Sequence, residues 1–494
     1  MELPYRGSGN VLYKGEKHRC HLYYSEKLGG IVIKVIVKNE KPIGDFLKLP
    51  LDIDYLIGQL DSGFHFTLLK LIRTQMQDLV SYSTSEYTFE ARYMLCGLGE
   101  NQKEGFEPTF HKVEYVLSNI VEWGEKSAYT VGENYELIAK SDDIKKTLYE
   151  SPFFNINYFV RGSFLPFTER DLLKEKIELE QHGIIEIEYN SEQNICSFDN
   201  IFERLKRLVE IASLRKINIE RVYAYSKDIY YDIQDKTVER AIEIYGRNIK
   251  EFEAQDPAQG RSWKWITLSE LVQQHSFEKY FDKHDKLAPI VELFLEPFYV
   301  SDFSTSRIFL NVVQALETYH SRFITTKLDD FKIRVKTLVE ELPEELQQKT
   351  ESFLLAKSKS FITLESRIAD LLLANWKIHF DTGEINRNDF PSVIAHTRNY
   401  YVHYDESIKQ RERILEENEL GIYNRALFKI LEYYILIELG FSEDDAKITD
   451  KLKERWGNIS QDLEILKLSR ERSKTENHKI QIKPFESLGC IILI

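Results

Sequence analysis

The chain has 494 residues, enough for roughly two to four domains, and its 43% hydrophobic content is ordinary for a globular protein. The formal net charge of −14 gives no overall attraction to nucleic acid, so any RNA must be bound by a local patch. Because the four cysteines contain no C-x-x-C pair, we expect neither a disulfide framework nor a zinc site. The N-terminus lacks a signal-peptide pattern, and no apolar stretch reaches about 18 residues. We therefore expect a cytoplasmic protein without membrane attachment.

The N-terminal part is rich in predicted strands. Segment 31–39 alternates with a period of two and is rich in β-branched residues, and segments 87–98 and 182–190 behave in the same way. Apolar residues repeat at spacings of three and four in 52–60 and 113–123, which predicts two short helices there. We expect an antiparallel sheet or sandwich with little helix.

The hydrophobic period changes at Ser197, a suitable N-cap for a helix over 198–212. Segment 218–226 returns to the pattern of a strand. From about residue 288 the pattern is helical, so the sequence predicts an α+β chain with a β-rich first half and an all-α bundle behind it. We divide the chain into a β-rich domain, a helical domain and a charged tail, at 1–285, 286–465 and 466–494.

Several amphipathic helices are predicted in the second half. They cover 303–323, 329–342, 362–380, a segment opening at 389–391, and 421–440. Asp389 is a candidate cap and Pro391 suits a first turn, while Gly440 is a typical residue just beyond a helix end. His320 is expected to be an exposed helix residue.

The candidate site lies in the helix that opens at 389–391, within the segment PSVIAHTRNYYVH. Arg398 and His403 form an R-x4-H pair, and Asn399 follows the arginine directly. The spacing alone is weak, since with 12 histidines about one chain in two of this composition contains such a pair by chance. Arg472 and His478 form a similar pair in the polar tail, but they lack a capped helix.

Helix geometry separates the two charged side chains. Asn399 and His403 share one face at a spacing of four, whereas Arg398 lies about 140° from His403 around the axis. The pair therefore suits a groove better than a pocket on a single face. Two such helices meeting across a two-fold axis would bring arginine and histidine from both chains into one composite site.

Cleavage of RNA needs few other groups. A base removes the proton of a ribose 2′-OH, an acid protonates the 5′ leaving oxygen, and a cation stabilises the phosphorane between them. His403 can act as acid or base near neutral pH, and Arg398 offers a rigid fork for phosphate. Asn399 would hold the imidazole or the helix turn. This chemistry requires no metal and no cofactor.

The R-N-x-x-x-H motif at the start of a late helix, within an all-α bundle, resembles the HEPN ribonuclease superfamily. The segments VVQALETYHSRF, RIADLL and FKILEYYILIELGF are similar to the ApeA-type HEPN domain, and the strands with VLSNIVEWGE are similar to the ApeA N-terminal domain. Together these segments cover most of the chain. The resemblance implies a bacterial antiphage protein acting by abortive infection. It would be a homodimeric, metal-independent endoribonuclease that cleaves RNA, with tRNA as a candidate, after a phage-derived trigger.

The resemblance also implies site residues. The catalytic residues carried over are Arg398, Asn399 and His403. Glu317 matches an acidic position on an early HEPN helix, where it would either orient Arg398 through a charge-assisted hydrogen bond or be solvated. His396, one turn before Tyr400, would line the same groove or be an ordinary surface histidine. Tyr400 begins an aromatic run unusual for this family, suited either to stacking of bases or to packing of the bundle.

Two other functions remain open from the sequence. The first is a non-catalytic HEPN-like protein that senses or holds a partner, which the net charge and the aromatic helix allow. The second is a toxin held by a separate partner protein. The large attached N-terminal half favours control within the chain over control by a partner.

Overall fold

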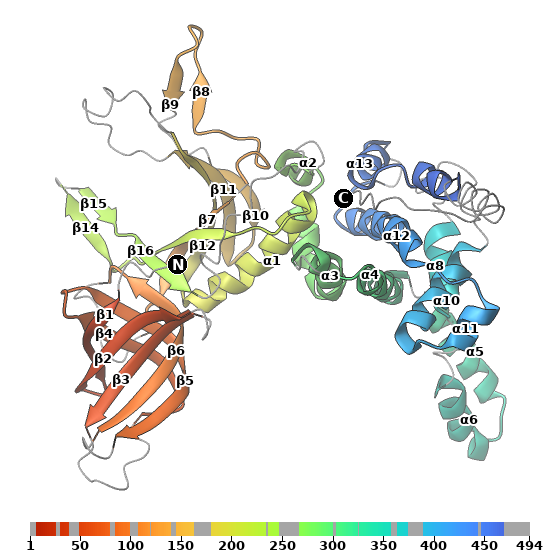
Figure 1. Cartoon of the computed structure of the whole chain (residues 1–494), viewed down its shortest axis with the longest axis horizontal. Helices are drawn as coiled ribbons and strands as arrows, with labels where there is room; N and C mark the ends of the chain where they lie inside the picture. Colours follow the sequence, from red (N-terminus) through yellow and green to blue (C-terminus); the bar gives the residue numbers. More distant parts are fainter. Residues whose placement is uncertain are drawn as a thin grey trace, which may run out of the picture. The chain divides into compact units, whose positions relative to one another are not determined.

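The protein is described by a computed structural model (Figure 1). The chain divides into two compact units, Met1–Gln273 and Gln274–Ile494. The residues that the structure describes are 6–25, 30–38, 49–79, 84–98, 107–118, 120–139, 145–162, 179–233, 236–246, 266–299, 303–324, 326–356, 363–373, 389–442 and 446–468.

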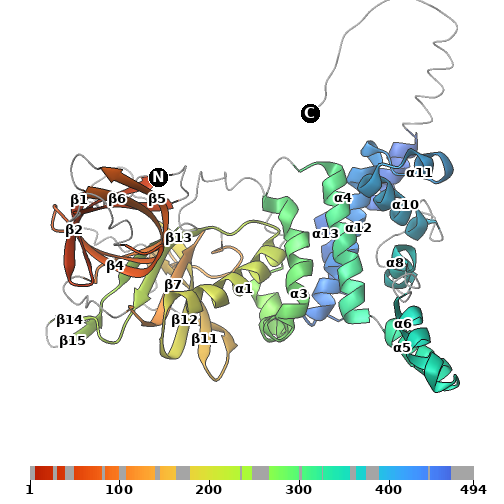
Figure 2. The same ribbon diagram turned by 90° about the horizontal axis from the view of Figure 1, so that it is seen from below.

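The first strands of the N-terminal unit close into a barrel, seen nearly along its axis in Figure 2. They are β1 (Gly7–Tyr13), β2 (Glu16–Ser25), β3 (Gly30–Lys38), β4 (Asp52–Leu60), β5 (His65–Leu79) and β6 (Thr84–Cys96). The strand order is β6-β3-β2-β1-β4-β5, and β5 pairs again with β6, so that every neighbour is antiparallel and the circle is complete. The alternation predicted for 31–39 and 87–98 is confirmed in β3 and β6.

The barrel is filled by side chains. Apolar residues from all its strands form one buried cluster, including Ile33, Phe66 and Phe89, which are fully buried. Gly58 of β4 lies directly opposite Phe66 of β5, and a Cβ atom at Gly58 would come within 2.2 Å of the Phe66 ring. The absence of a side chain at Gly58 therefore makes room for an aromatic ring in the core.

Replacing Gly58 by Ala is expected to destabilise the barrel by about 1–3 kcal/mol, because the extra methyl overpacks a filled core. The measurement is amide hydrogen exchange of β4 and β5, which should accelerate. Gly421→Ala is a matched control, since no atom lies within 4 Å of a Cβ built there. Unchanged exchange in β4 and β5 of the Gly58 variant would show that the Phe66 ring moves aside freely.

The other strands of the unit extend the barrel into an open sheet. They are β7 (Phe110–Leu117), β10 (Lys146–Glu150), β11 (Phe154–Gly162), β12 (Gln181–Gln193), β13 (Ile219–Tyr225) and β16 (Ile242–Gly246). The first part of one edge of β6 pairs with β3 and the last part, Tyr93–Cys96, pairs with β16. From β16 the order continues as β13-β7-β12-β11-β10. Two small hairpins add β8 (Tyr129–Val131) with β9 (Leu137–Ala139), and β14 (Tyr230–Ile233) with β15 (Lys236–Glu239).

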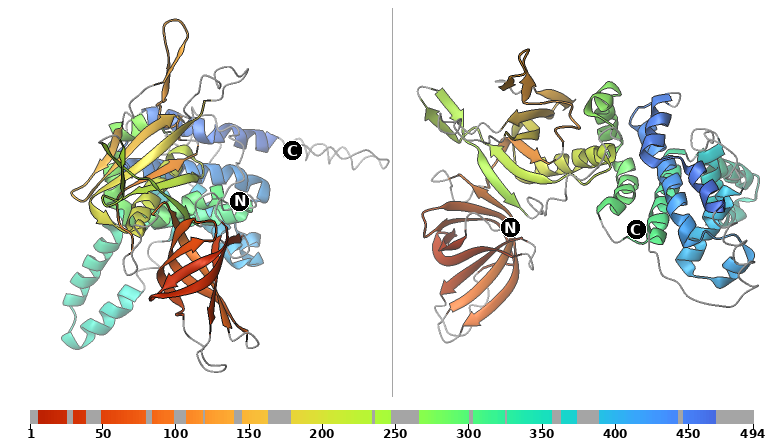
Figure 3. Two further views of the ribbon diagram at one scale, coloured as in Figure 1. Left: turned by 90° about the vertical axis from the view of Figure 1, so that its left-hand side faces the viewer. Right: turned by 45° about the horizontal axis from the view of Figure 1, so that its top comes forward.

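Helix α1 (Ile195–Ser213) packs against one face of this open sheet (Figure 3). Tyr115 of β7 stacks on Phe202 of α1, with ring centroids 3.9 Å apart. The predicted helix is confirmed, but the predicted cap is wrong. Asn194 is the N-cap, and its side chain accepts a hydrogen bond from the Ser197 backbone N–H at 3.1 Å. The helix begins before its apolar stripe, which is why the stripe alone placed the cap too late.

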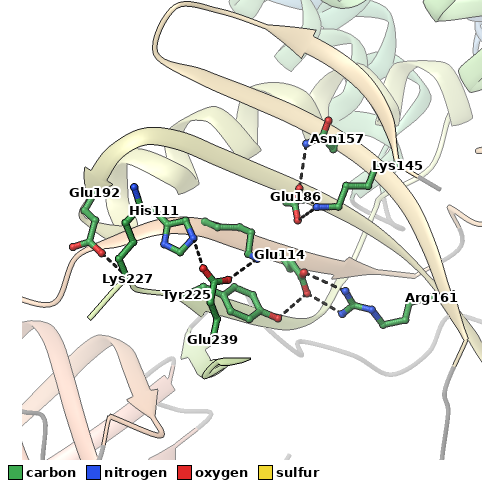
Figure 4. Close-up of polar contacts among 11 residues, drawn as sticks. His111, Glu114, Lys145, Asn157, Arg161, Glu186, Glu192, Tyr225, Lys227 and Glu239 are labelled. Atoms are coloured by element: carbon green, nitrogen blue, oxygen red, sulfur yellow. Dashed lines mark hydrogen bonds and ion pairs between the residues drawn. The ribbon is translucent and has the colours of Figure 1, made fainter. Parts of the chain in front are cut away.

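The opposite face of the sheet carries ion pairs (Figure 4). Arg161 donates two hydrogen bonds to Glu114, at 2.9 and 3.2 Å, and the Tyr225 hydroxyl donates to the same carboxylate. Lys145 donates to both oxygens of Glu186 at 2.8 Å. Glu114 is 3% exposed and Glu186 is 0% exposed, so each buried carboxylate needs its cation to remain in the sheet.

Both short helices predicted in this unit are wrong. Segment 52–60 is strand β4, in which Ile53 and Leu56 both belong to the barrel core although they are three residues apart. Regular pairing is interrupted at Asp54, opposite Lys70, whose φ is 53°. Because of that interruption, the residues that point into the barrel shift by one position along β4. The resulting spacing of three between Ile53 and Leu56 resembles that of a helix. In segment 113–123, residues 113–117 are the end of strand β7 and residues 121–123 form a turn. Strand β7 lies between β12 and β13 and is buried on both faces, so its sequence does not alternate between apolar and polar residues.

The C-terminal unit is helical, as predicted. Its described elements are α3 (Ser276–Tyr299), α4 (Thr305–Tyr319), the π-helix η6 (His320–Ile324), α5 (Thr326–Glu340), α6 (Glu344–Ala356), α8 (Leu364–Leu373), α10 (Phe390–His403), α11 (Glu406–Arg411), α12 (Glu417–Glu438) and α13 (Ala446–Trp456). The short helix α2 (Leu268–Gln273) ends the N-terminal unit. Position 285, where we placed the domain boundary, falls inside α3, and the two compact units divide after Gln273.

Helix α12 is the centre of the bundle and packs against α3, α4 and α13. Phe428 stacks on Trp456 of α13 with ring centroids 5.2 Å apart, and Phe294 of α3 meets Phe428 edge-on. Gly440 follows the helix with a φ of 99°, as predicted for this position, and its N–H donates to the Ile437 carbonyl. Within the described ranges, every helix is too short or too polar to cross a membrane.

Candidate active site

Helix α10 carries the R-N-x-x-x-H motif. Asp389 occupies the N-cap position and Pro391 the first turn, as predicted, although the Asp389 side chain makes no capping hydrogen bond. The helix ends at His403, because Tyr404 adopts the left-handed conformation with a φ of 51°. The motif therefore occupies the last turns of the helix, and its histidine is the last helical residue.

One face of α10 anchors it in the bundle. Phe390 stacks on Tyr423 of α12 with centroids 5.6 Å apart, and Tyr401 lies near Phe309 of α4. Thr397 is fully buried, and its hydroxyl accepts the Leu415 backbone N–H at 3.0 Å. These contacts fix the rotation of the helix about its axis.

The motif residues lie off this anchored face. Arg398 and Asn399 are half-buried, and His403 is exposed. The Arg398 guanidinium donates a hydrogen bond to Asn399 Oδ1 at 3.3 Å. Arg398 and His403 are separated by about 140° around the axis and about 7.5 Å along it, so one helix does not close a pocket around a phosphate. Asn399 is therefore placed to orient the arginine of its own chain.

The aromatic run forms a cluster at the helix end. The Tyr400 and Tyr401 rings meet edge-on at 5.2 Å, and Tyr404 contacts both. Tyr401 donates to the Leu415 carbonyl at 3.4 Å, and burial raises its pKa, so it remains a neutral packing residue. Tyr404 is 67% exposed. The run thus contains both an anchored tyrosine and one that is open to solvent.

The residues proposed as support lie in different surroundings. His396 pairs with Glu412 at 3.3 Å, and Tyr400 donates to Glu406 at 3.3 Å. Glu317 of α4 faces Arg367 of α8 at 4.0 Å. Arg398 donates to Asn399, and helix α4, which carries Glu317, packs against α10, so the role of Glu317 beside the motif stays a prediction.

The expectation that His320 is exposed is wrong. Its side chain is 1% exposed, and its Nε2 lies 3.1 Å from an Asp370 oxygen. His320 lies four residues after Leu316 and seven after Val313, both fully buried, so regular helical spacing places it on the buried face of α4, and the π-helix η6 begins at this residue. The sequence therefore contained this signal, and the expectation overlooked it. Among the described residues, no group of three or more histidine, cysteine or acidic side chains is arranged to hold a metal ion.

Comparison with known families covers both units. Residues 4–258 match the family model ApeA N-terminal domain 1, and residues 310–445 match the model Apea-like HEPN, which includes α10. No curated protein and no solved structure matches the chain. HEPN domains are generally ribonuclease-like and generally act as dimers on RNA. The chain therefore belongs to the ApeA-type family of HEPN proteins.

Proposed function

We propose that this chain is a metal-independent endoribonuclease that acts in the cytoplasm in antiphage defence, by abortive infection after a phage-derived trigger. The observation that carries the proposal is the end of α10, where exposed His403 and half-buried Arg398 lie off the face that anchors the helix. The match of residues 310–445 to the Apea-like HEPN model supports the same reaction class. Its substrate is RNA, with tRNA as the first candidate.

In the proposed reaction, the imidazole of His403 from one copy removes the proton of a ribose 2′-OH. The 2′ oxygen attacks the adjacent phosphorus, and the bond to the 5′ oxygen breaks. The second copy of His403 gives a proton to that leaving oxygen. Arg398 stabilises the charge on the non-bridging oxygens, held by its bond to Asn399. The products are a 2′,3′-cyclic phosphate and a 5′-hydroxyl end.

Exposed groups suited to RNA lie at this end of α10 within a segment of mixed charge. Lys409 and Arg411 on α11 are exposed, as are Asp405 and Glu406, and Lys409 Nζ lies 5.7 Å from the centre of the Tyr400 ring. The exposed ring of Tyr404 meets the Tyr400 ring edge-on and offers a surface on which an unpaired base can stack.

The shared site makes a quantitative prediction. When wild-type and His403→Ala chains are co-expressed at equal levels in phage-infected cells, with the same total amount of chain as in the wild-type control, RNA cleavage should fall to about a quarter. The reason is that mixed dimers contain one histidine where acid and base are both needed. Fragments should carry 2′,3′-cyclic phosphate ends and should also form with the purified, activated protein in EDTA.

A fall to only about half would mean that each chain works alone, which contradicts the composite site. A requirement for added Mg²⁺ would contradict the metal-independent reaction. If the wild-type protein protects cells from phage while the RNA in those infected cells stays intact, this result would favour the non-catalytic sensor.

A further inference from the structure

A cavity of about 390 Å³ lies within the N-terminal unit. Strands β5 and β6 of the barrel, strands β7, β13 and β16 of the open sheet, and helix α1 all contribute to its lining. It is therefore located where β6 passes from the barrel into the sheet. Its volume falls in the range of about 300–1,000 Å³ that is usual for small-molecule sites.

Asp199 of α1 is the central polar group of this cavity. The hydroxyls of Tyr93 and Tyr115 each donate to one of its carboxylate oxygens, the latter at 2.9 Å. Tyr115 is itself held by stacking on Phe202. A carboxylate has about four acceptor positions, so two donors fix its orientation and leave capacity for a ligand. Burial raises the pKa of Asp199, although both hydroxyls oppose that shift.

The other charges of the lining favour a donor ligand. Glu203 adds a second carboxylate beside Asp199, against the cations Lys70 and Arg92. Lys70 is already engaged, because it donates to two carboxylates that do not line the cavity, at 3.1 and 3.4 Å. The Arg92 guanidinium lies over the neighbouring Tyr93 ring, 5.2 Å from its centre. Acceptors thus exceed the donors that remain for a ligand.

The rest of the lining is apolar. Ile195, Ile219, Val222 and Ile244 are all 5% exposed or less, and they line the cavity together with the aromatic rings. A ligand that fills this volume must therefore bury an apolar body and present donors at one end. An anionic ligand would meet the carboxylates of Asp199 and Glu203, at a cost that Arg92 alone does not offset.

We propose that this cavity binds a small organic amine, whose ammonium group donates to Asp199 and whose apolar body packs against the isoleucine and aromatic walls. A protonated amine supplies two or three N–H donors and a positive charge for the carboxylates. The aromatic walls add attraction for the cation. This inference concerns binding by the N-terminal unit and does not depend on the reaction proposed for α10.

The test is isothermal titration of the full chain with tyramine, phenethylamine, histamine and agmatine. At least one of these amines should bind, and Asp199→Asn should weaken that binding by about 10- to 100-fold, because the charge-assisted hydrogen bond is lost while shape is kept. Asp61→Asn is the matched control. It removes a carboxylate that pairs with Arg19 on the barrel, outside the cavity, and should leave binding unchanged.

A second variant keeps the experiment informative if Asp199→Asn fails to fold. Tyr115→Phe keeps the stacked ring and removes one hydroxyl that orients Asp199, so it should weaken amine binding less than Asp199→Asn does. The acid 4-hydroxyphenylacetate, which matches tyramine in shape, should not bind. Binding of the acid as tightly as the amine, equal amine binding by wild type and Asp199→Asn, or no binding by any of the four amines would overturn the proposal. RNA cleavage is measured separately and does not enter this result.

Discussion

Replacing His403 by Ala is expected to reduce RNA cleavage in phage-infected cells by about 100-fold or more, because acid and base steps both lose their proton carrier. The side chain is exposed at the last residue of α10, so the fold should be unaffected and the melting temperature should change by no more than about 1–2 °C. The measurements are sequencing of RNA ends with a 2′,3′-cyclic phosphate and thermal unfolding of the purified chain.

The chain supplies its own controls for this experiment. His478→Ala changes the histidine of the similar motif in the tail, and it should leave cleavage intact. His396 lies on α10 like His403, and its replacement by Ala removes a surface ion pair with Glu412, which follows α11. This change should have a small effect on RNA cleavage. Cleavage that persists in the His403 variant, or that is lost equally in all three, would place the reaction elsewhere.

Replacing Glu432 by Ala is expected to lower the unfolding free energy of the helical unit by about 3–5 kcal/mol. Glu432 of α12 and Arg455 of α13 are both fully enclosed, with 0% of each side chain exposed, and their charged atoms lie 2.8 Å apart. Trp456 donates its indole N–H to the same carboxylate. The truncation would leave a buried guanidinium without its counter-charge, which costs more than the loss of a surface pair.

Thermal unfolding followed by helical circular dichroism measures this change, which should lower the melting temperature by about 10 °C. Asp462→Ala is the matched control, because it breaks the partly exposed pair with Arg425 of the same helix and should cost less than about 1 kcal/mol. Replacing both charged residues by apolar ones, in the double variant Glu432→Leu with Arg455→Met, should recover much of the lost unfolding free energy. Equal effects of the Glu432 and Asp462 single variants would contradict the argument from burial.

Short-range sequence patterns predicted the elements that have regular pairing or a clear helix start. Strand β3 alternates because it is paired along its length in a barrel with one filled face, and α10 was located from Asp389 and Pro391. The errors arise where distant partners decide. Strand β7 is covered on both faces, β4 is irregular opposite Lys70, and the closure of the barrel depends on pairing between β5 and β6. None of these arrangements can be recognised from a short segment of sequence, because each depends on contacts with distant residues.

The site shows the same division. Spacing and the cap at Asp389 predicted that Arg398, Asn399 and His403 share one helix, because these are properties of a single helix. The expected position at the start of that helix is wrong, because Tyr404 ends α10 directly after His403. The surroundings of Glu317 depend on how α4 packs against its neighbours, and the structure places this residue 4.0 Å from Arg367 of α8. The burial of His320 was open to prediction, because it lies four residues after Leu316 and seven after Val313 on the buried face of α4.

The sharing of β6 has a consequence for how the N-terminal half can be divided. A closed barrel usually behaves as a module that can be moved or deleted, since it has no free edge. Here the last part of β6, Tyr93–Cys96, has its edge covered by β16, which comes almost 150 residues later in the chain. A fragment that stopped after β6 would expose that edge and invite association with other chains. The barrel and the sheet therefore form one structural unit, which a truncation between them would disrupt.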